Sequence, residues 1–305
     1  MTNEQYLRNL LPPTGLVDAV LDTDTYNEVD DQFAMSYMLK RTDRICTKAV
    51  YAAPFFNRRV ESAAAGMERS YQEIVTLQKL LKTDIPTFRG STGYLPDEKT
   101  AVESEAARHL VELAKNYSPE KPLYVVAIGA ITNVASALIM DPSIAENIVI
   151  VWLGGSALHR TDATEFNMEQ DYPAARVIFG CGAPVVMFPC CGIVDVFRTG
   201  EWELKHWLAG KNEVCDYLIE TVLDETYRYA KGKPWTRVVW DVTAVGWLTN
   251  NGKFFKHRLE DNIIPQDDAT YLRDSSRSIC YVYEINRDYL FEDLFNTLAQ
   301  NGGLS

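Results

Sequence analysis

The chain has 305 residues, of which 47% are hydrophobic and 24% are charged. These values are typical of a globular protein with a large core and exclude a disordered or fibrous chain. The formal net charge of −12 repels phosphate backbones and anionic lipids, so nucleic acid and membrane surfaces are not expected partners.

Apolar runs such as 123–131 fall short of the ~20 residues of a membrane helix, and no signal-peptide pattern is visible, so a cytoplasmic protein is expected. The six cysteines show no CxxC spacing and are expected to be reduced.

Apolar runs rich in β-branched residues alternate with helical patterns through the first two thirds of the chain. Strands are expected at 16–21, 45–51, 123–128, 148–153 and 184–188, and helices at 30–40, 61–81 and 102–116. The last third is more helical, with helices expected at 201–208, 214–229 and 241–250, then a strand at 279–284 and a helix at 289–300. This alternation predicts an α/β fold, a mainly parallel sheet with helices on both faces. No linker or internal repeat divides the chain, so residues 1–305 are expected to form a single domain.

Four aspartates follow the first expected strand. They are Asp22, Asp24, Asp30 and Asp31, in the stretch DTDTYNEVDD. Carboxylates this close repel one another, and a bound calcium ion, which takes ~6–8 oxygen ligands, would offset the repulsion. Capping of the next helix explains only the DD pair. The loop is not an EF-hand, because it lacks the glycine and the terminal glutamate that this motif requires at fixed spacings. Open α/β sheets bind ligands beyond the carboxyl ends of their strands, so this loop is a candidate metal site.

Three later stretches carry turn signals or polar residues. GAITN, at 129–133, read alone is an ordinary strand-to-helix turn. The long loop after 148–153 contains His159, Glu165 and Asn167, which suit either a hydroxyl-rich ligand or a solvated surface. Trp240 and Asp241 open a helical pattern, where they either face a site or simply pack and cap the helix. No GxSxG, P-loop or HExxH pattern occurs, which removes support for the corresponding hydrolases and nucleotide-binding proteins.

Taken in order, these stretches resemble the inosine-uridine preferring nucleoside hydrolase family over most of the chain. DTDTYNEVDD is similar to the family's N-terminal aspartate signature with two extra residues, and GAITN is similar to its GPLTN-like turn. EFN, at 165–167, matches the family's ribose-binding EFN, and WD, at 240–241, occupies the place of its late metal aspartate. The resemblance implies a calcium-dependent enzyme that hydrolyses the N-glycosidic bond of ribonucleosides, assembled as a homodimer or homotetramer.

The resemblance also implies roles for individual residues. A Ca2+ ion would be held by Asp24, Asp30, Asp31, Asp241 and the backbone carbonyl of Thr132. Asp24 would also take the proton of the attacking water. The ribose would contact Asp30, Asn57, His159, Glu165 and Asn167, with His159 in the place of a family asparagine. Trp240 would contact the base. Members acting on inosine and uridine carry a histidine at this place, whereas the purine-specific branch carries a tryptophan, which favours purine nucleosides.

Three other functions are weighed from the sequence. A non-catalytic nucleoside or ribose sensor on the same fold would keep the sugar contacts and lose water activation, but Asp24, Asp31 and Asp241 are all present. The same fold could also serve a hydrolase of another ribosyl compound. A phosphatase with an aspartate nucleophile is suggested by DTDT after the first strand, but it would need a downstream lysine and acidic pair, and no convincing set occurs.

Overall fold

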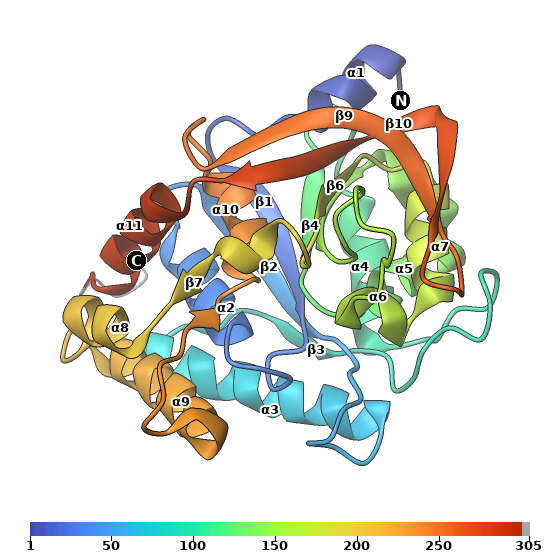
Figure 1. The fold of residues 1–305 in the computed structure, drawn as a ribbon. Coiled ribbons are helices and arrows are strands. Elements are labelled where there is room, and N and C mark those ends of the chain that lie inside the picture. Colours follow the sequence, from blue (N-terminus) through green and yellow to red (C-terminus); the bar gives the residue numbers. More distant parts are fainter. Residues whose placement is uncertain (301–305) are drawn as a thin grey trace.

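The computed structural model describes residues 1–300, and an eight-stranded sheet lies at its centre (Figure 1). The strands follow the order β3-β2-β1-β4-β5-β6-β10-β9, and every neighbouring pair except β9 and β10 is parallel. The predicted mainly parallel sheet is therefore confirmed. The strands are β1 (Val17–Thr23), β2 (Ile45–Ala52), β3 (Thr87–Arg89), β4 (Leu123–Ala127), β5 (Ile148–Leu153), β6 (Val185–Phe188), β9 (Phe255–Pro265) and β10 (Tyr271–Ile285). A separate antiparallel pair is formed by β7 (Arg198–Thr199) and β8 (Arg237–Val238).

Helices cover both faces of the sheet, as the alternating pattern predicts. In β1, Leu21 belongs to one buried hydrophobic cluster and its neighbour Val20 to the other, because successive side chains of a strand point to opposite faces. The first cluster includes side chains of α2 (Asp31–Lys40), α3 (Ala63–Leu81), α8 (Glu201–Leu208), α9 (Glu213–Ala230), α10 (Val242–Thr249) and α11 (Arg287–Leu298). The second includes side chains of α4 (Glu105–Ala114), α5 (Thr132–Met140) and α7 (Tyr172–Gly180). Two short helices, α1 (Asn3–Asn9) and α6 (Phe166–Gln170), complete the α-helices of the described residues.

The largest difference from the expected elements is a long hairpin of β9 and β10, which arches over the top of the molecule in Figure 1. Only the part at 279–284 was expected to be a strand, and it lies inside β10. The rest of the hairpin lies at the edge of the sheet, where side chains such as Lys256 and Arg258 are exposed. An exposed edge strand carries few apolar residues, so the run of charged side chains conceals the strand pattern.

The direction of strand addition reverses between β1 and β4. From β1 the chain adds β2 and β3 on one side, and from β4 it adds β5 and β6 on the other. The loops that leave the carboxyl ends of β1 and β4 therefore diverge and leave a crevice between them, which is where open α/β sheets bind ligands. The acidic loop follows β1 and the GAITN turn follows β4, so both predicted motifs lie at this switch point.

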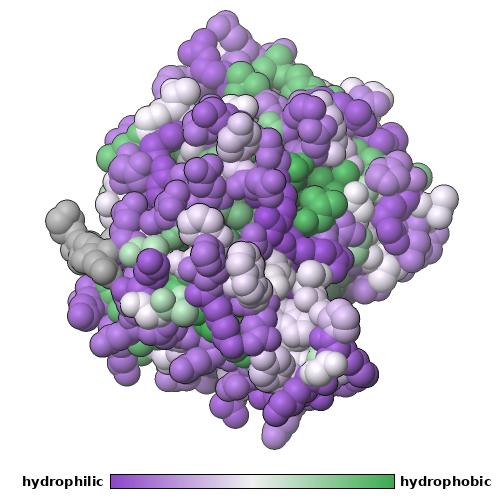
Figure 2. Space-filling view, turned by 60° about the vertical axis from the view of Figure 1, so that its left-hand side comes forward, coloured by the Kyte–Doolittle hydropathy of each residue, from purple (hydrophilic) through white to green (hydrophobic). Residues whose placement is uncertain are grey.

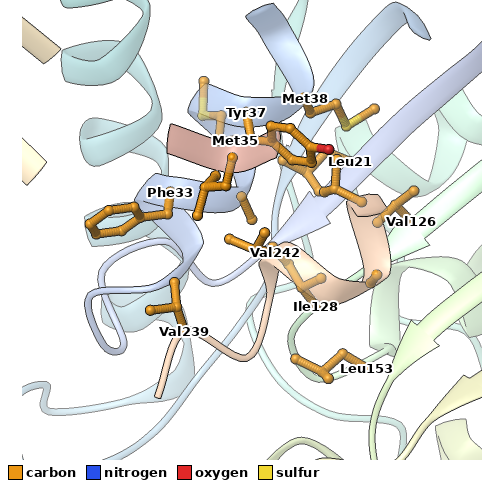
Figure 3. Close-up of a cluster of buried hydrophobic side chains, with 14 of the residues drawn as sticks. Leu21, Phe33, Met35, Tyr37, Met38, Val126, Ile128, Leu153, Val239 and Val242 are labelled. Atoms are coloured by element: carbon orange, nitrogen blue, oxygen red, sulfur yellow. The ribbon is translucent and has the colours of Figure 1, made fainter. Parts of the chain in front are cut away.

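A hydrophobic cluster supports the crevice from below (Figure 3). Phe33 and Met35 of α2 pack in the same buried cluster as Val242 of α10 and Ile128 after β4. The cluster fixes the start of α2 against the start of α10, although the two helices are about 200 positions apart in the sequence.

Hydrophilic residues cover most of the face shown in Figure 2, with hydrophobic residues gathered in small patches. Within residues 1–300, no helix combines the length and the apolar character that crossing a membrane requires. All six cysteines are free thiols, as expected.

Candidate active site

The acidic loop and the start of α10 bring four aspartates together at the switch point. Asp30 and Asp31 lie at the start of α2, and Asp241 lies directly before α10. One carboxylate oxygen from each of these three residues lies within 4.8 Å of the other two. Asp24, which follows β1, is 1% exposed, and its pKa responds to the charges of Asp30 and Asp31. The sequence places three of these aspartates near one another, and the fold adds Asp241.

The ionisation of these carboxyl groups is strongly suppressed. Burial, reinforced by the neighbouring carboxylates, raises the pKa of Asp24 and of Asp241 well above the ordinary range. Burial and the charge of Asp30 raise the pKa of Asp31 to about 7. So many buried acids are costly in their ionised form unless a cation neutralises them.

The donor atoms of the cluster fit a hard divalent cation. All are carboxylate oxygens, the ligand type that calcium and magnesium prefer. The Oδ2 atom of Asp24 is buried and has no hydrogen-bond partner among the described residues. Because buried acceptors are normally satisfied, an unpartnered oxygen beside three converging carboxylates indicates a site for a cation.

The four aspartates line a cavity together with other polar residues and with apolar residues. Glu165 and Asn167 contribute polar groups, and Ile128, Leu153 and Trp240 contribute apolar surface. The indole N–H of Trp240 is buried and has no partner within residues 1–300. A small molecule with a hydroxyl-rich part and a flat apolar part matches this division of the cavity.

Glu165 and Asn167 are held in place by backbone groups. The Glu165 carboxylate accepts hydrogen bonds from the backbone N–H groups of Gly155 (2.7 Å), Asn167 (2.9 Å) and Met168 (3.1 Å), so it also caps α6. The Asn167 side-chain nitrogen donates to the carbonyls of Ile128 (3.1 Å) and Leu153 (3.0 Å). With this nitrogen engaged, the amide oxygen of Asn167 is the atom that remains to bind a ligand donor.

Hydrogen bonds hold the GAITN turn against Asp22 and other residues near the cluster. Asn133 Nδ2 donates to Asp22 Oδ1 (2.7 Å), and the Asn133 amide oxygen accepts from the backbone N–H of Ser91 (2.7 Å). The Thr132 hydroxyl donates to Asp171 Oδ2 (2.7 Å), so the side chain of Thr132 is already engaged, and it does not line the cavity. These bonds tie the start of α5 to the end of β1, to the segment after β3 and to Asp171, which lies directly before α7.

The structure does not bring Asn57 or His159 to the cavity wall. Asn57 donates from Nδ2 to Asn27 Oδ1 (2.7 Å), and Asn27 does line the cavity, so Asn57 reaches it only through that neighbour. His159 is exposed and lines a separate depression with Arg258 and Arg273. Of the residues expected from the sequence, Asp24, Asp30, Asp31, Glu165, Asn167, Trp240 and Asp241 converge on one cavity.

Other cavity residues were not identified from the sequence. Asn27 and Glu28 belong to the acidic loop itself, so their place in DTDTYNEVDD was the available signal. Cys190 and Cys191 follow β6, and their position at the carboxyl end of a parallel strand was the signal for them. Arg237, which pairs with Glu28, carried no signal because its partner lies 209 positions away.

The covered sheet and the carboxylate cluster at its switch point define an α/β protein with a candidate hard-cation site beyond the carboxyl ends of its strands. Residues 19–276 match the family model described as inosine-uridine preferring nucleoside hydrolase. The chain therefore belongs to this family, as its motifs suggest.

Relatives by sequence carry pyrimidine names. A probable uridine nucleosidase 2 of Arabidopsis thaliana is 31% identical over 144 residues, which cover 46% of this chain and 44% of the relative. A pyrimidine-specific ribonucleoside hydrolase of Citrobacter koseri is 36% identical over 163 residues, which cover 50% of each chain. The chain thus spans about half the length of these two relatives.

Two of the similar solved structures carry purine names. A purine-preferring ribonucleoside hydrolase from Gardnerella vaginalis has a TM-score of 0.75 at 18% identity, over 92% of this chain and 98% of that one. An inosine-guanosine nucleoside hydrolase has a TM-score of 0.76 at 18% identity, over 93% of this chain and 99% of that one. At this identity the likeness shows a shared fold.

Proposed function

We propose that this chain catalyses the calcium-dependent hydrolysis of the N-glycosidic bond of ribonucleosides, releasing the free base and ribose. The observation that carries the proposal is the buried aspartate cluster, which lines the same cavity as Glu165, Asn167 and Trp240. Carboxylates and an aromatic side chain in one cavity suit a ligand with a sugar and a base. Membership of a nucleoside hydrolase family supports the same conclusion.

The residues that would hold the Ca2+ ion are Asp24, Asp30, Asp31 and Asp241, which line the cavity. The family resemblance adds the backbone carbonyl of Thr132, a residue that lies outside the cavity wall. When bound, the ion supplies Lewis acidity and a positive charge that favours the loss of a proton from water in the cavity.

Asp24 is the group that takes this proton. The water oxygen then bonds to the anomeric carbon, and the electrons of the breaking C–N bond leave with the base. Asp30, Glu165 and Asn167 bind the ribose hydroxyls and hold the sugar in line for this attack. The surrounding carboxylates stabilise the positive charge that develops on the sugar ring in the transition state.

Trp240 supports a preference for purine nucleosides within this proposal. Its ring lines the cavity and offers a broad face to a stacked base. The negative face of an aromatic ring also attracts a base that becomes protonated as it leaves. Because the relatives include proteins named for pyrimidine and for purine nucleosides, substrate measurements decide between the two classes.

The test is the release of base and ribose from a panel of purine and pyrimidine nucleosides, with calcium and with a calcium chelator. Asp24→Ala should lower kcat by about 100- to 10,000-fold, the usual contribution of a general base. Asp288→Ala, whose carboxylate is 87% exposed, is the control and should keep wild-type turnover. Full activity in Asp24→Ala would contradict the mechanism. Calcium binding without hydrolysis of any nucleoside would favour the sensor alternative.

A further inference from the structure

We propose that the ion pair between Glu28 and Arg237 positions the segment 231–241 against the acidic loop, and thereby sets the places of Trp240 and Asp241 in the cavity. Arg237 is then a positioning residue that acts through its neighbours. The inference rests on the proposed hydrolase function for one of its readouts and adds to that function a residue outside the cavity wall.

The pair joins two parts of the chain that are distant in sequence. Arg237 lies in β8, and its Nη2 donates to Oε2 of Glu28, which lies in the loop after β1 and lines the cavity. The Arg237 side chain is 15% exposed, and its Nη1 also donates to the Tyr229 hydroxyl (3.2 Å). Its Nε is buried without a partner in the described part of the chain. A mostly buried guanidinium of this kind is held in one place.

The segment 231–241 has few other links to the acidic loop. Its regular structure is the two-residue strand β8, which pairs with β7, and the backbone N–H of Val239 donates to the carbonyl of Phe197 (2.9 Å). Both bonds attach the segment to the 197–199 region. Besides the carboxyl groups of Asp30, Asp31 and Asp241, which meet in the cavity, the ion pair with Glu28 is a polar side-chain bond between the segment and the acidic loop.

The positive charge of Arg237 also offsets the repulsion between nearby carboxylates. Asp30 and Asp241 lie on the two walls of the cavity, and one carboxylate oxygen of each lies within 4.8 Å of the other. Two carboxylates at this distance repel each other when both are ionised. Burial alone lowers the pKa of Arg237, but the carboxylates of Glu28 and Asp30 outweigh that effect and raise it. One cation on the segment therefore offsets the repulsion that would push the walls apart.

A second cation, Arg59, has a different task. It pairs with Glu225 of α9 (2.5 Å) and donates to the carbonyl of Tyr26 (3.3 Å), so it fixes the acidic loop to α9. The charge of Arg59 lowers the pKa of Glu28, whereas the arginine charge that lowers the pKa of Asp30 is that of Arg237. Removing Arg237 should therefore leave the acidic loop anchored while it releases the segment with Trp240 and Asp241.

The experiment compares Arg237→Gln, Glu28→Gln and the double variant with wild type. Each single variant should lower kcat about 10- to 100-fold, since a displacement of ~1 Å in an active site costs ~100-fold. If the two residues act as a pair, the double variant should lose no more than the worse single variant. Arg237→Lys, which keeps the charge, should recover part of the loss. Arg108→Gln, which breaks a surface pair with Glu103 in which Arg108 is 53% exposed, is the control and should behave as wild type.

Calcium titration of the metal-free proteins separates positioning from charge alone. If Arg237 places Asp241, the calcium affinity of Arg237→Gln should fall several-fold. If its charge alone mattered, removing a cation would raise that affinity, and the positioning role would be overturned. Wild-type kcat in Arg237→Gln, or fully additive losses in the double variant, would also overturn it. Should the wild-type protein hydrolyse no nucleoside, the proposed function fails, and the calcium titration still tests the pair.

Discussion

Replacing Gly129 with alanine tests whether the position of Asp24 limits turnover. Gly129 follows β4, and a Cβ added there would lie 3.0 Å from Asp24 Cγ and 3.2 Å from Asp24 Oδ1. Ordinary contacts of a Cβ atom begin at 3.4 Å, so the Asp24 carboxylate must move by a few tenths of an ångström. Gly129 is not among the glycines with positive φ, so alanine suits the backbone. Because ~1 Å of misplacement costs ~100-fold, we expect kcat to fall about 10-fold.

The control is Gly93→Ala, because no atom lies within 4 Å of the Cβ added there and its φ is also ordinary. Initial rates of ribose release at saturating nucleoside and fixed calcium give kcat for both variants, and thermal unfolding shows whether each is folded. A wild-type kcat for Gly129→Ala would refute the reasoning, as would an equal loss in Gly93→Ala.

Three further predictions address stability, protonation and base recognition. Glu165→Gln replaces a carboxylate that accepts three backbone hydrogen bonds, so urea unfolding should show a loss of about 1–3 kcal/mol in the free energy of unfolding. Glu169→Gln, at an exposed position, is the control. An unchanged free energy of unfolding in Glu165→Gln would contradict this role. The pKa of Asp31 is raised to about 7 in the metal-free protein. The contribution of protonated Asp31 to the free energy of unfolding is therefore fully present below pH 3.8, the ordinary pKa, and is lost as the pH rises through 7. Thermal unfolding midpoints measured across this range should record the loss. Calcium must displace the same proton, so calorimetric affinity should fall by up to about 10-fold per pH unit from pH 7 to 6, and a flat profile would count against the site. Trp240→Ala should lower kcat/KM for purine nucleosides more than for pyrimidine nucleosides, and equal losses would remove the purine preference.

The sequence by itself determined the features that depend on neighbouring residues. Alternating strands and helices predicted the parallel sheet and its covered faces, since burial on both faces demands continuous apolar strands. Asp24, Asp30 and Asp31 lie within one loop, so no knowledge of the fold was needed to place them together. The order of four motifs was enough to identify the family.

The tertiary structure decided which distant residues meet and where each side chain points. Asp241 joins the acidic loop because α2 and α10 pack on one hydrophobic cluster, a contact between residues about 200 positions apart. Glu28 and Arg237 meet for the same reason. The Glu165 carboxylate accepts hydrogen bonds from three backbone N–H groups while it lines the cavity, and His159 lines another depression. Loop conformation sets these side-chain directions, and sequence spacing does not. The edge hairpin was hidden because charged residues such as Lys256 and Arg258 interrupt its apolar ones, and its pairing with β6 joins segments distant in sequence.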